Sequence, residues 1–109
     1  MQIDKETNEK MQELQILEQN FQGIAMQKQA LQIDESESKT ALEELGKAKG
    51  EVFRVLGQIM IKSDKETLKK ELEERLKLVG IKLKTVEKHE LEIREEIERI
   101  RGEIMEKIK

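Results

Sequence analysis

Apolar residues recur at alternating steps of three and four over two long stretches of the chain. The first series runs from Leu14 to Leu45, and its extrapolated positions are polar in the middle third, at Lys28, Glu35 and Ser38. This 3.5-residue period is that of the a and d positions of a coiled coil, so we predict two long helices, the first more loosely packed in its middle. The second series is denser and has one polar member, Glu90: Leu72, Leu76, Val79, Leu83, Val86, Glu90, Ile93, Ile97, Ile100 and Ile104.

The segment between the two series has a different composition. The stretch from Gly46 to Gly50 interrupts the first helix, and the residues that follow are rich in β-branched side chains. Gly57 and Gln58 suit the central positions of a type II′ turn, because glycine supplies positive φ at the first of them. The sequence therefore predicts a β-hairpin in which Leu56 faces Ile59, Arg54 faces Ile61 and Val52 faces Ser63.

The predicted elements form one mostly α domain over residues 1–109: a helix at about 4–46, a β-hairpin at about 52–63 and a helix at about 64–107. Helices of this length span ~65 Å each, and their equality indicates an antiparallel two-helix coiled-coil hairpin with the β-hairpin at its base. Ser63 and Glu66 match a capping box, which makes Ser63 the predicted N-cap of the second helix. We expect Gly102 to let the distal end of that helix fray.

Both faces of the predicted β-hairpin are mainly apolar, and one pair of helices cannot cover both. A two-stranded ribbon is also marginal in water, and its outer edges present unpaired backbone groups. We therefore expect the strands to complete a larger sheet or barrel made with other subunits. The expected oligomer interface consists of Val52, Phe53, Val55, Leu56, Ile59, Met60 and Ile61.

The composition favours long helices and excludes several kinds of chemistry. The 109 residues are 41% charged and 2% aromatic, and they include no Pro, Cys or Trp. A chain without cysteine has no disulfide or thiolate site, and a single histidine forms no imidazole cluster. The stretch from Gly46 to Gly50 also lacks the spacing of a P-loop. We expect no enzymatic activity, no metal and no cofactor.

The charge pattern bears on partners and location. The formal net charge is −3, and no basic stripe is present for nucleic acid or anionic lipid. No apolar run approaches the roughly 20 residues needed to cross a bilayer, and the first residues contain no signal-like apolar core. We therefore expect no nucleic-acid partner, no membrane partner and a cytoplasmic protein.

Several apolar side chains lie outside the a and d positions, where an isolated helix pair leaves them in water: Met11, Ile16, Met26, Ile33, Leu78, Ile81, Leu91, Met105 and Ile108. Scattered exposed apolar residues are ordinary. A functional interpretation is that flexible Met and Ile side chains near the termini adapt to many non-native chains. The candidate client-binding tip consists of Ile3, Met11, Ile104, Met105 and Ile108.

The chain resembles the beta-type subunits of prefoldin over nearly its whole length. The resemblance rests on Gln27-Lys28-Gln29, on Ala41-Leu42-Glu43-Glu44-Leu45, and above all on the stretch from Glu51 to Lys62. That stretch looks like the family's hairpin pattern, Val-Tyr/Phe-Lys/Arg-x-x-Gly-x-x-x-Val/Ile-Lys, and a single hairpin marks the beta type.

The resemblance implies a heterohexamer of an alpha-type subunit and further beta-type copies, whose hairpins form a barrel platform. It also implies a chaperone that holds unfolded client proteins at the tips of its coiled coils without ATP and transfers them to a group II chaperonin. Two alternatives stay open. A passive coiled-coil spacer or adaptor would not suppress aggregation, and a nucleic-acid-binding helical arm would bind at low salt, although the acidic balance argues against it.

Overall fold

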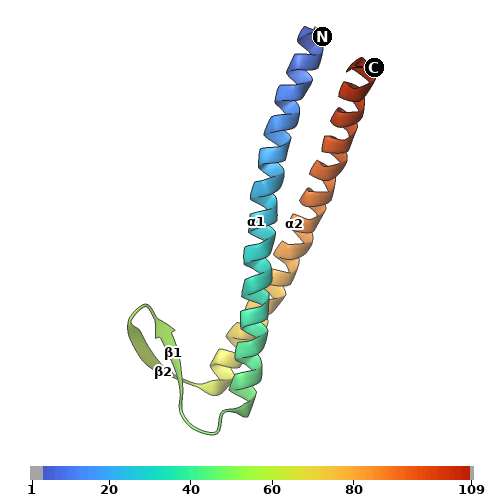
Figure 1. Ribbon diagram of the computed structural model, residues 1–109. Coiled ribbons are helices and arrows are strands. Elements are labelled where there is room, and N and C mark those ends of the chain that lie inside the picture. Colours follow the sequence, from blue (N-terminus) through green and yellow to red (C-terminus); the bar gives the residue numbers. More distant parts are fainter. Residues whose placement is uncertain (1–3, 109) are drawn as a thin grey trace. The chain divides into compact units, whose positions relative to one another are not determined.

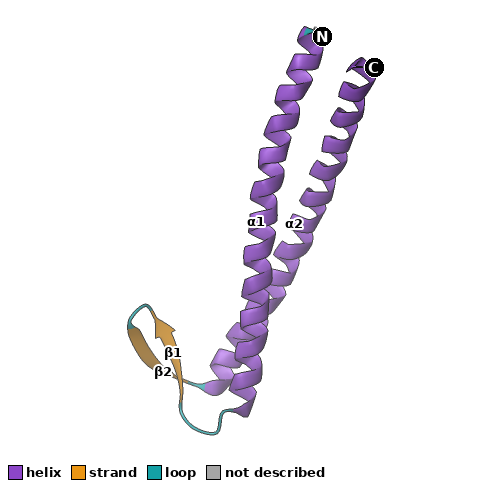
Figure 2. Cartoon of the chain, in the orientation of Figure 1, coloured by secondary structure: helices purple, strands orange, loops and turns teal. Residues whose placement is uncertain are grey.

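The structure is a computed structural model that describes residues 4–108. Its elements follow in the order α1 (Lys5–Lys47), β1 (Val52–Leu56), β2 (Ile59–Ser63) and α2 (Lys65–Ile108), as Figures 1 and 2 show. The predicted order of helix, β-hairpin and helix is confirmed, and each helix boundary differs from the predicted one by a single residue. In the part described, no helix is long and apolar enough to span a membrane.

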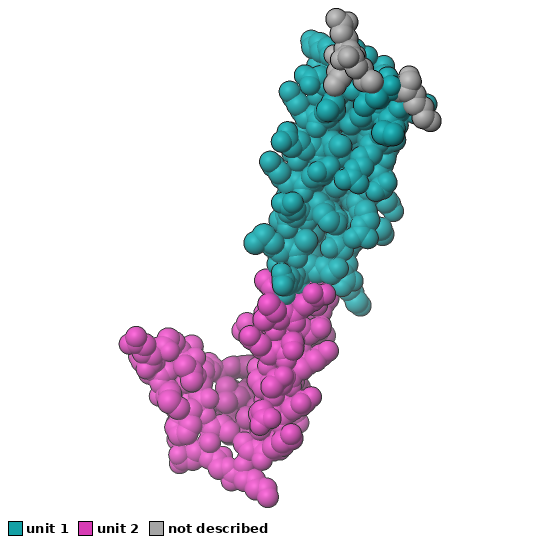
Figure 3. Space-filling view, viewed as in Figure 1, with its two compact units in different colours: residues 1–29, 84–109 teal, residues 30–83 magenta. Residues whose placement is uncertain are grey.

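The chain divides into two compact units, coloured separately in Figure 3. Unit 1 comprises residues 1–29 and 84–109, and unit 2 comprises residues 30–83. Unit 1 thus contains the terminal parts of both helices, whereas unit 2 contains the β-hairpin with the helical parts that lead into it and away from it.

Both helices begin with the same four residues, Asp-Lys-Glu-Thr, and both are capped in the same way. The Oδ1 atom of Asp4 accepts a hydrogen bond from the N–H of Thr7 at 2.7 Å. The Oδ2 atom of Asp64 accepts one from the N–H of Thr67 at 3.2 Å. Each aspartate therefore satisfies an amide of the first turn that has no partner within the helix.

The prediction that Ser63 is the N-cap of α2 is wrong. Ser63 is the last residue of β2, where it pairs with Val52, and its hydroxyl donates to the carbonyl of Ile61 at 3.3 Å. The chain leaves the strand one residue later, so Asp64 is the residue free to adopt the capping conformation. The helix starts where the strand pairing ends.

The core of unit 1 is built mainly from the dense series on α2. Ile97 and Ile104 are buried, and Ile100 is 1% exposed. Two interhelical ion pairs bracket this core: Lys10 Nζ lies 3.0 Å from Glu103 Oε2, and Arg101 Nη2 lies 3.3 Å from Glu18 Oε1. The α1 members of the seam are half-buried at Leu14, Leu17, Phe21 and Ile24.

The distal part of α2 is continuous in the structure. The helix runs through Gly102 to Ile108, and Ile104 beyond the glycine is 7% exposed. Ile104 packs the turn that follows the glycine into the core of unit 1, and the fraying that we expect from Gly102 stays a prediction.

Unit 2 combines a small apolar core with a polar network. Leu45, Val79 and Leu83 are buried. Ser38, predicted as a polar d position, is 4% exposed, and its hydroxyl lies 3.3 Å from Asp34 Oδ1. The polar middle of the α1 series is thus filled by hydrogen bonds in place of apolar contacts.

The β-hairpin has the predicted register. Leu56 pairs with Ile59, and the antiparallel ladder continues through Arg54 with Ile61 to Val52 with Ser63. Gly57 has φ of 62°, and among the described residues no residue other than glycine has positive φ. Type I′ would require positive φ at both central positions, so the conformation agrees with the predicted type II′ turn.

Candidate functional site

The β-hairpin of unit 2 exposes most of the predicted oligomer interface. Val52 is half-buried, whereas Phe53 is 44% exposed and Met60 is 66% exposed. The remaining predicted interface residues are also exposed: Val55, Leu56, Ile59 and Ile61. The apolar side chains alternate between the two faces of the ribbon, so neither face is polar.

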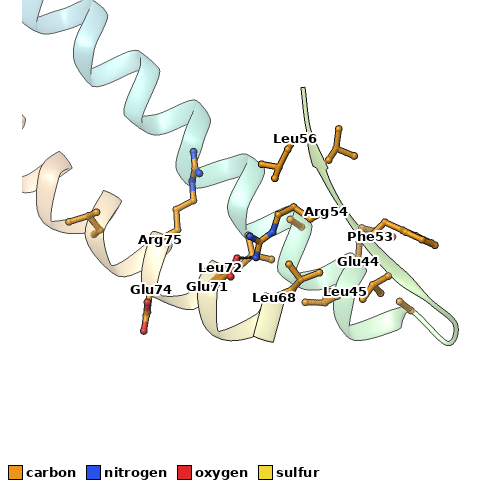
Figure 4. A pocket seen from close by; sticks show the side chains of 15 residues that line it. Glu44, Leu45, Phe53, Arg54, Leu56, Leu68, Glu71, Leu72, Glu74 and Arg75 are labelled. Atoms are coloured by element: carbon orange, nitrogen blue, oxygen red, sulfur yellow. Dashed lines mark hydrogen bonds and ion pairs between the residues drawn. The ribbon is translucent and has the colours of Figure 1, made fainter. Parts of the chain in front are cut away.

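A groove of about 930 Å³ lies between the ribbon and the helical part of unit 2. Figure 4 shows Arg54 and Leu56 of β1 pointing toward the helices, while Phe53 points away from them. The helical wall of the groove is mostly apolar and includes Leu45 of α1 and Leu68, Leu72 and Leu78 of α2. One face of the ribbon therefore borders this groove, and on the other face Phe53 is 44% exposed and Met60 is 66% exposed.

Polar contacts tether the groove side of unit 2. Arg54 of β1 forms an ion pair with Glu71 of α2. The amine of Lys65 donates to the carbonyl of Ala48 at 3.1 Å, which places a positive charge near the C-terminal end of α1. These contacts connect the ribbon and the adjoining segments to the helices across the groove, where the apolar side chains are not in close contact.

Asp34 of α1 forms an ion pair with Arg75 of α2 in unit 2. Arg75 Nε donates a hydrogen bond to its Oδ1 at 2.8 Å. This hydrogen bond, with a smaller contribution from the Ser38 hydroxyl, holds the pKa of Asp34 below its usual value and raises the pKa of Arg75. The pair joins α1 to α2 and makes the charged form of Asp34 part of the folded structure.

A second electrostatic contact joins the ends of the helices in unit 1. The hydrogen bond from Lys10 lowers the pKa of Glu103, and the same contact raises the pKa of Lys10. Lys107 Nζ also lies 3.2 Å from Glu6 Oε2. These exposed pairs align the first turns of α1 with the last turns of α2.

The candidate client-binding tip is only partly available at the surface. Met11 is 41% exposed, Met105 is 60% exposed and Ile108 is 38% exposed. Ile104 is buried in the core of unit 1, and Ile3 lies outside the described residues. The surface part of the tip therefore consists of Met11, Met105 and Ile108.

All nine apolar residues that we expected outside the seam are exposed in the structure. In the range 4–108, no group of three or more His, Cys, Asp or Glu side chains is arranged to hold a metal ion. What the chain offers to partners is thus an apolar ribbon and apolar side chains along the helices.

Comparisons with known proteins agree with this geometry. The profile of a family described as "Prefoldin subunit" matches residues 8–109. The chain is 30% identical over 108 residues to the prefoldin subunit beta of Methanothrix thermoacetophila, covering 97% of this chain and 90% of the relative. It is 34% identical over 100 residues to the prefoldin subunit beta of Thermoplasma volcanium, covering 89% of this chain and 81% of the relative.

Two solved structures are similar in fold. The crystal structure of the prefoldin beta subunit from Thermococcus strain KS-1 gives a TM-score of 0.86 at 23% identity, over 96% of this chain and 94% of that chain. The prefoldin beta2 subunit from the same strain gives a TM-score of 0.72 at 19% identity, over 80% of this chain and 95% of that chain.

Proposed function

The chain belongs to the prefoldin family, and from this premise we propose that it is an ATP-independent holdase subunit for unfolded polypeptides. Prefoldin is a family of chaperones and not of enzymes. The match over residues 8–109 supports a beta-type chaperone subunit, because it includes both helices and the single β-hairpin. The holding of clients at the coiled-coil ends and their transfer to a group II chaperonin belong to the proposal.

The observation that carries the proposal is the exposed apolar ribbon. A two-stranded ribbon with apolar side chains on both faces is marginal in water, and the helices of unit 2 border only one face, which favours pairing with strands of other subunits. Phe53 and Met60 are exposed apolar side chains and suit burial in a β-barrel shared between subunits. The presence of a beta and a beta2 subunit in Thermococcus strain KS-1 supports an assembly of more than one subunit type.

We assign client binding to the exposed side chains near the ends of the helices in unit 1. Met11 and Met105 are flexible and polarizable, which lets one surface fit many non-native sequences. Each contact with a client is weak, so holding a client needs the helix ends of several subunits at once. We propose that an alpha-type subunit and further beta-type copies supply them in one assembly. The same reasoning favours a cytoplasmic complex that acts before a group II chaperonin.

An aggregation assay with the assembled complex tests this function. The complex should keep a chemically denatured client in solution without ATP. Replacement of Met11, Met105 and Ile108 by Ser should reduce holding while the mass of the complex stays the same. Leu91→Ser serves as the matched control, because Leu91 is a 54% exposed apolar residue on α2 away from the helix end.

The outcomes separate the alternatives. A complex of unchanged mass that suppresses no aggregation would leave the spacer or adaptor as the function. Retention of nucleic acid by the complex in filter binding at low salt would favour the helical-arm alternative. Loss of holding in the control variant to the same degree would move the client site away from the helix ends.

A further inference from the structure

Residues 14–29 of α1 carry much less charge than the rest of the molecule. Glu18 and Lys28 are the charged residues of this stretch, in a chain that is 41% charged. Both are directed to α2: Glu18 Oε1 accepts from Arg101 Nη2 at 3.3 Å, and Lys28 Nζ donates to Glu90 Oε1 at 3.0 Å. The solvent side of this stretch is therefore uncharged.

The heptad positions b, c and f of this part of α1 form one exposed surface, which we name the amide face. It consists of Gln15, Ile16, Gln19, Gln22, Gly23, Met26 and Gln29, all exposed. The corresponding positions of α2 in the same unit are predominantly charged, at Lys84, Lys88, Glu92, Glu95, Glu98 and Arg99. Charged residues are thus accommodated at these heptad positions on α2. The lack of charge at the same positions of α1 therefore needs another explanation.

The glutamine amides of this face are unpaired in the part of the chain that the structure describes. Within residues 4–108, the side chains of its four glutamines form no hydrogen bond to another residue. Met26, at 72%, is the most exposed large apolar side chain described, and Ile16 is 58% exposed. These two lie ~15 Å apart along the helix, with Gly23 between them. Nothing lies within 4 Å of the position that a Cβ would take at this glycine.

We propose that the amide face binds the backbone of unfolded polypeptide along residues 15–29 of α1, in addition to the side chains at the helix ends. This inference rests on the proposed holdase function. A glutamine amide both donates and accepts, so it can pair with either backbone group of an unfolded chain whatever the client sequence. In folded proteins most of these backbone groups are paired internally, so a folded protein offers the glutamines far fewer partners.

The other features of the face suit the same occupant. Ile16 and Met26 contact apolar side chains of the client, and Gly23 lets a strand approach the helix closely. The absence of charge means that neither an acidic nor a basic unfolded chain is repelled. A folded partner of fixed surface would favour complementary charges, which this face lacks.

The first test places charge on the face. Gln19→Glu with Gln29→Glu leaves helix formation unchanged, because no charged residue lies three or four positions from either site. Binding to the assembled complex is measured by fluorescence anisotropy with two labelled probes, a reduced and alkylated acidic protein and a reduced and alkylated basic protein. The double variant should bind the acidic probe about five-fold more weakly, because two carboxylates repel it. For the basic probe the attraction to the carboxylates offsets the loss of two amide donors, so its affinity should change less than about two-fold.

The second test removes the apolar contacts. Ile16→Gln with Met26→Gln should weaken binding of both probes by about ten-fold, from the loss of buried apolar area. Leu91→Gln on α2 is the control and should change binding less than about two-fold. Circular dichroism and the mass of the complex verify that each variant folds and assembles.

The results distinguish the two levels of the proposal. Wild-type binding of both probes by both face variants, with loss of binding in the variant of Met11, Met105 and Ile108, would overturn the amide face and leave the holdase function standing. Binding of the same proteins in their folded state with equal affinity would also overturn backbone recognition. Failure of the unmodified complex to bind either unfolded probe would refute the holdase function itself.

Discussion

Lys28 of α1 and Glu90 of α2 face each other across the helix pair of unit 1, with Nζ and Oε1 3.0 Å apart. Their side chains are 29% and 15% exposed. Lys28 occupies a polar a position of the first apolar series, and Glu90 is the one polar residue of the second. A polar pair at such positions stabilises one register of the two helices over others, because any shift leaves a half-buried charge unpaired.

This pair gives a first prediction. Lys28→Leu alone should lower the free energy of unfolding by ~1–2 kcal/mol, since it leaves the largely buried Glu90 carboxylate without its partner. Lys28→Leu with Glu90→Leu should recover that loss or exceed wild-type stability. Urea unfolding of the two single variants and the double variant measures the coupling. Strictly additive effects would show that the pair does not set the register.

Phe53 gives a prediction about assembly. Phe53→Asp places a charge on the uncovered face of the ribbon and should prevent strand association, while the helical circular dichroism signal is retained. The mass of the complex formed with an alpha-type subunit measures the result. Leu91→Asp is the control, because it adds the same charge to an exposed site on α2 outside the ribbon. A Phe53→Asp variant that assembles like wild type would contradict the intersubunit barrel.

The N-cap of α2 can be tested directly. Asp64→Ala should destabilise the protein by ~1 kcal/mol, because the amide of Thr67 loses its acceptor. Ser63→Ala should cost much less, since the Ser63 hydroxyl donates to the carbonyl of Ile61 in its own strand. Thermal unfolding at equal concentration compares the two variants. The reverse order would restore Ser63 as the cap.

Two glycines should respond in opposite directions to alanine. Gly102→Ala should stabilise the protein by ~1 kcal/mol, because the residue lies inside α2 and nothing lies within 4 Å of the position that the alanine Cβ would take. Gly57→Ala should destabilise it by ~1 kcal/mol, because its φ of 62° is unfavourable for a residue with a Cβ. Unfolding temperatures measure both, and stabilisation by Gly57→Ala would contradict the turn conformation.

Asp34 predicts a pH dependence of stability. Its pKa is held below the usual value by Arg75, so the pair contributes fully above the unfolded-state pKa and is lost as pH falls through the lower folded-state pKa. Asp34→Asn should therefore be less stable than wild type at neutral pH, with the difference vanishing in strong acid. Glu43→Gln, at an exposed site on the same helix, is the control. A constant difference at all pH values would contradict the charge-based contribution.

The amino-acid pattern alone determined most of the fold. The dense series from Leu72 to Ile104 required a long helix with one buried stripe, and all of its members are buried or half-buried in the structure. The Gly57-Gln58 turn determined the hairpin register, because a two-residue turn leaves a single pairing of the flanking strands. The same periodicity predicted which apolar residues outside the a and d positions are exposed.

Tertiary structure decided the features that depend on where two distant segments meet. Periodicity placed Ile104 both in the seam and at the candidate tip, and only the packing of unit 1 buries it. The end of the β-ladder made Asp64 the cap in place of Ser63. The contacts of Lys28 with Glu90 and of Asp34 with Arg75 depend on the axial offset between α1 and α2. The helical period does not determine this offset, because a shift by one turn keeps the same faces together. A one-dimensional pattern specifies which face of a helix is buried, whereas the choice of the opposing residue belongs to the three-dimensional packing.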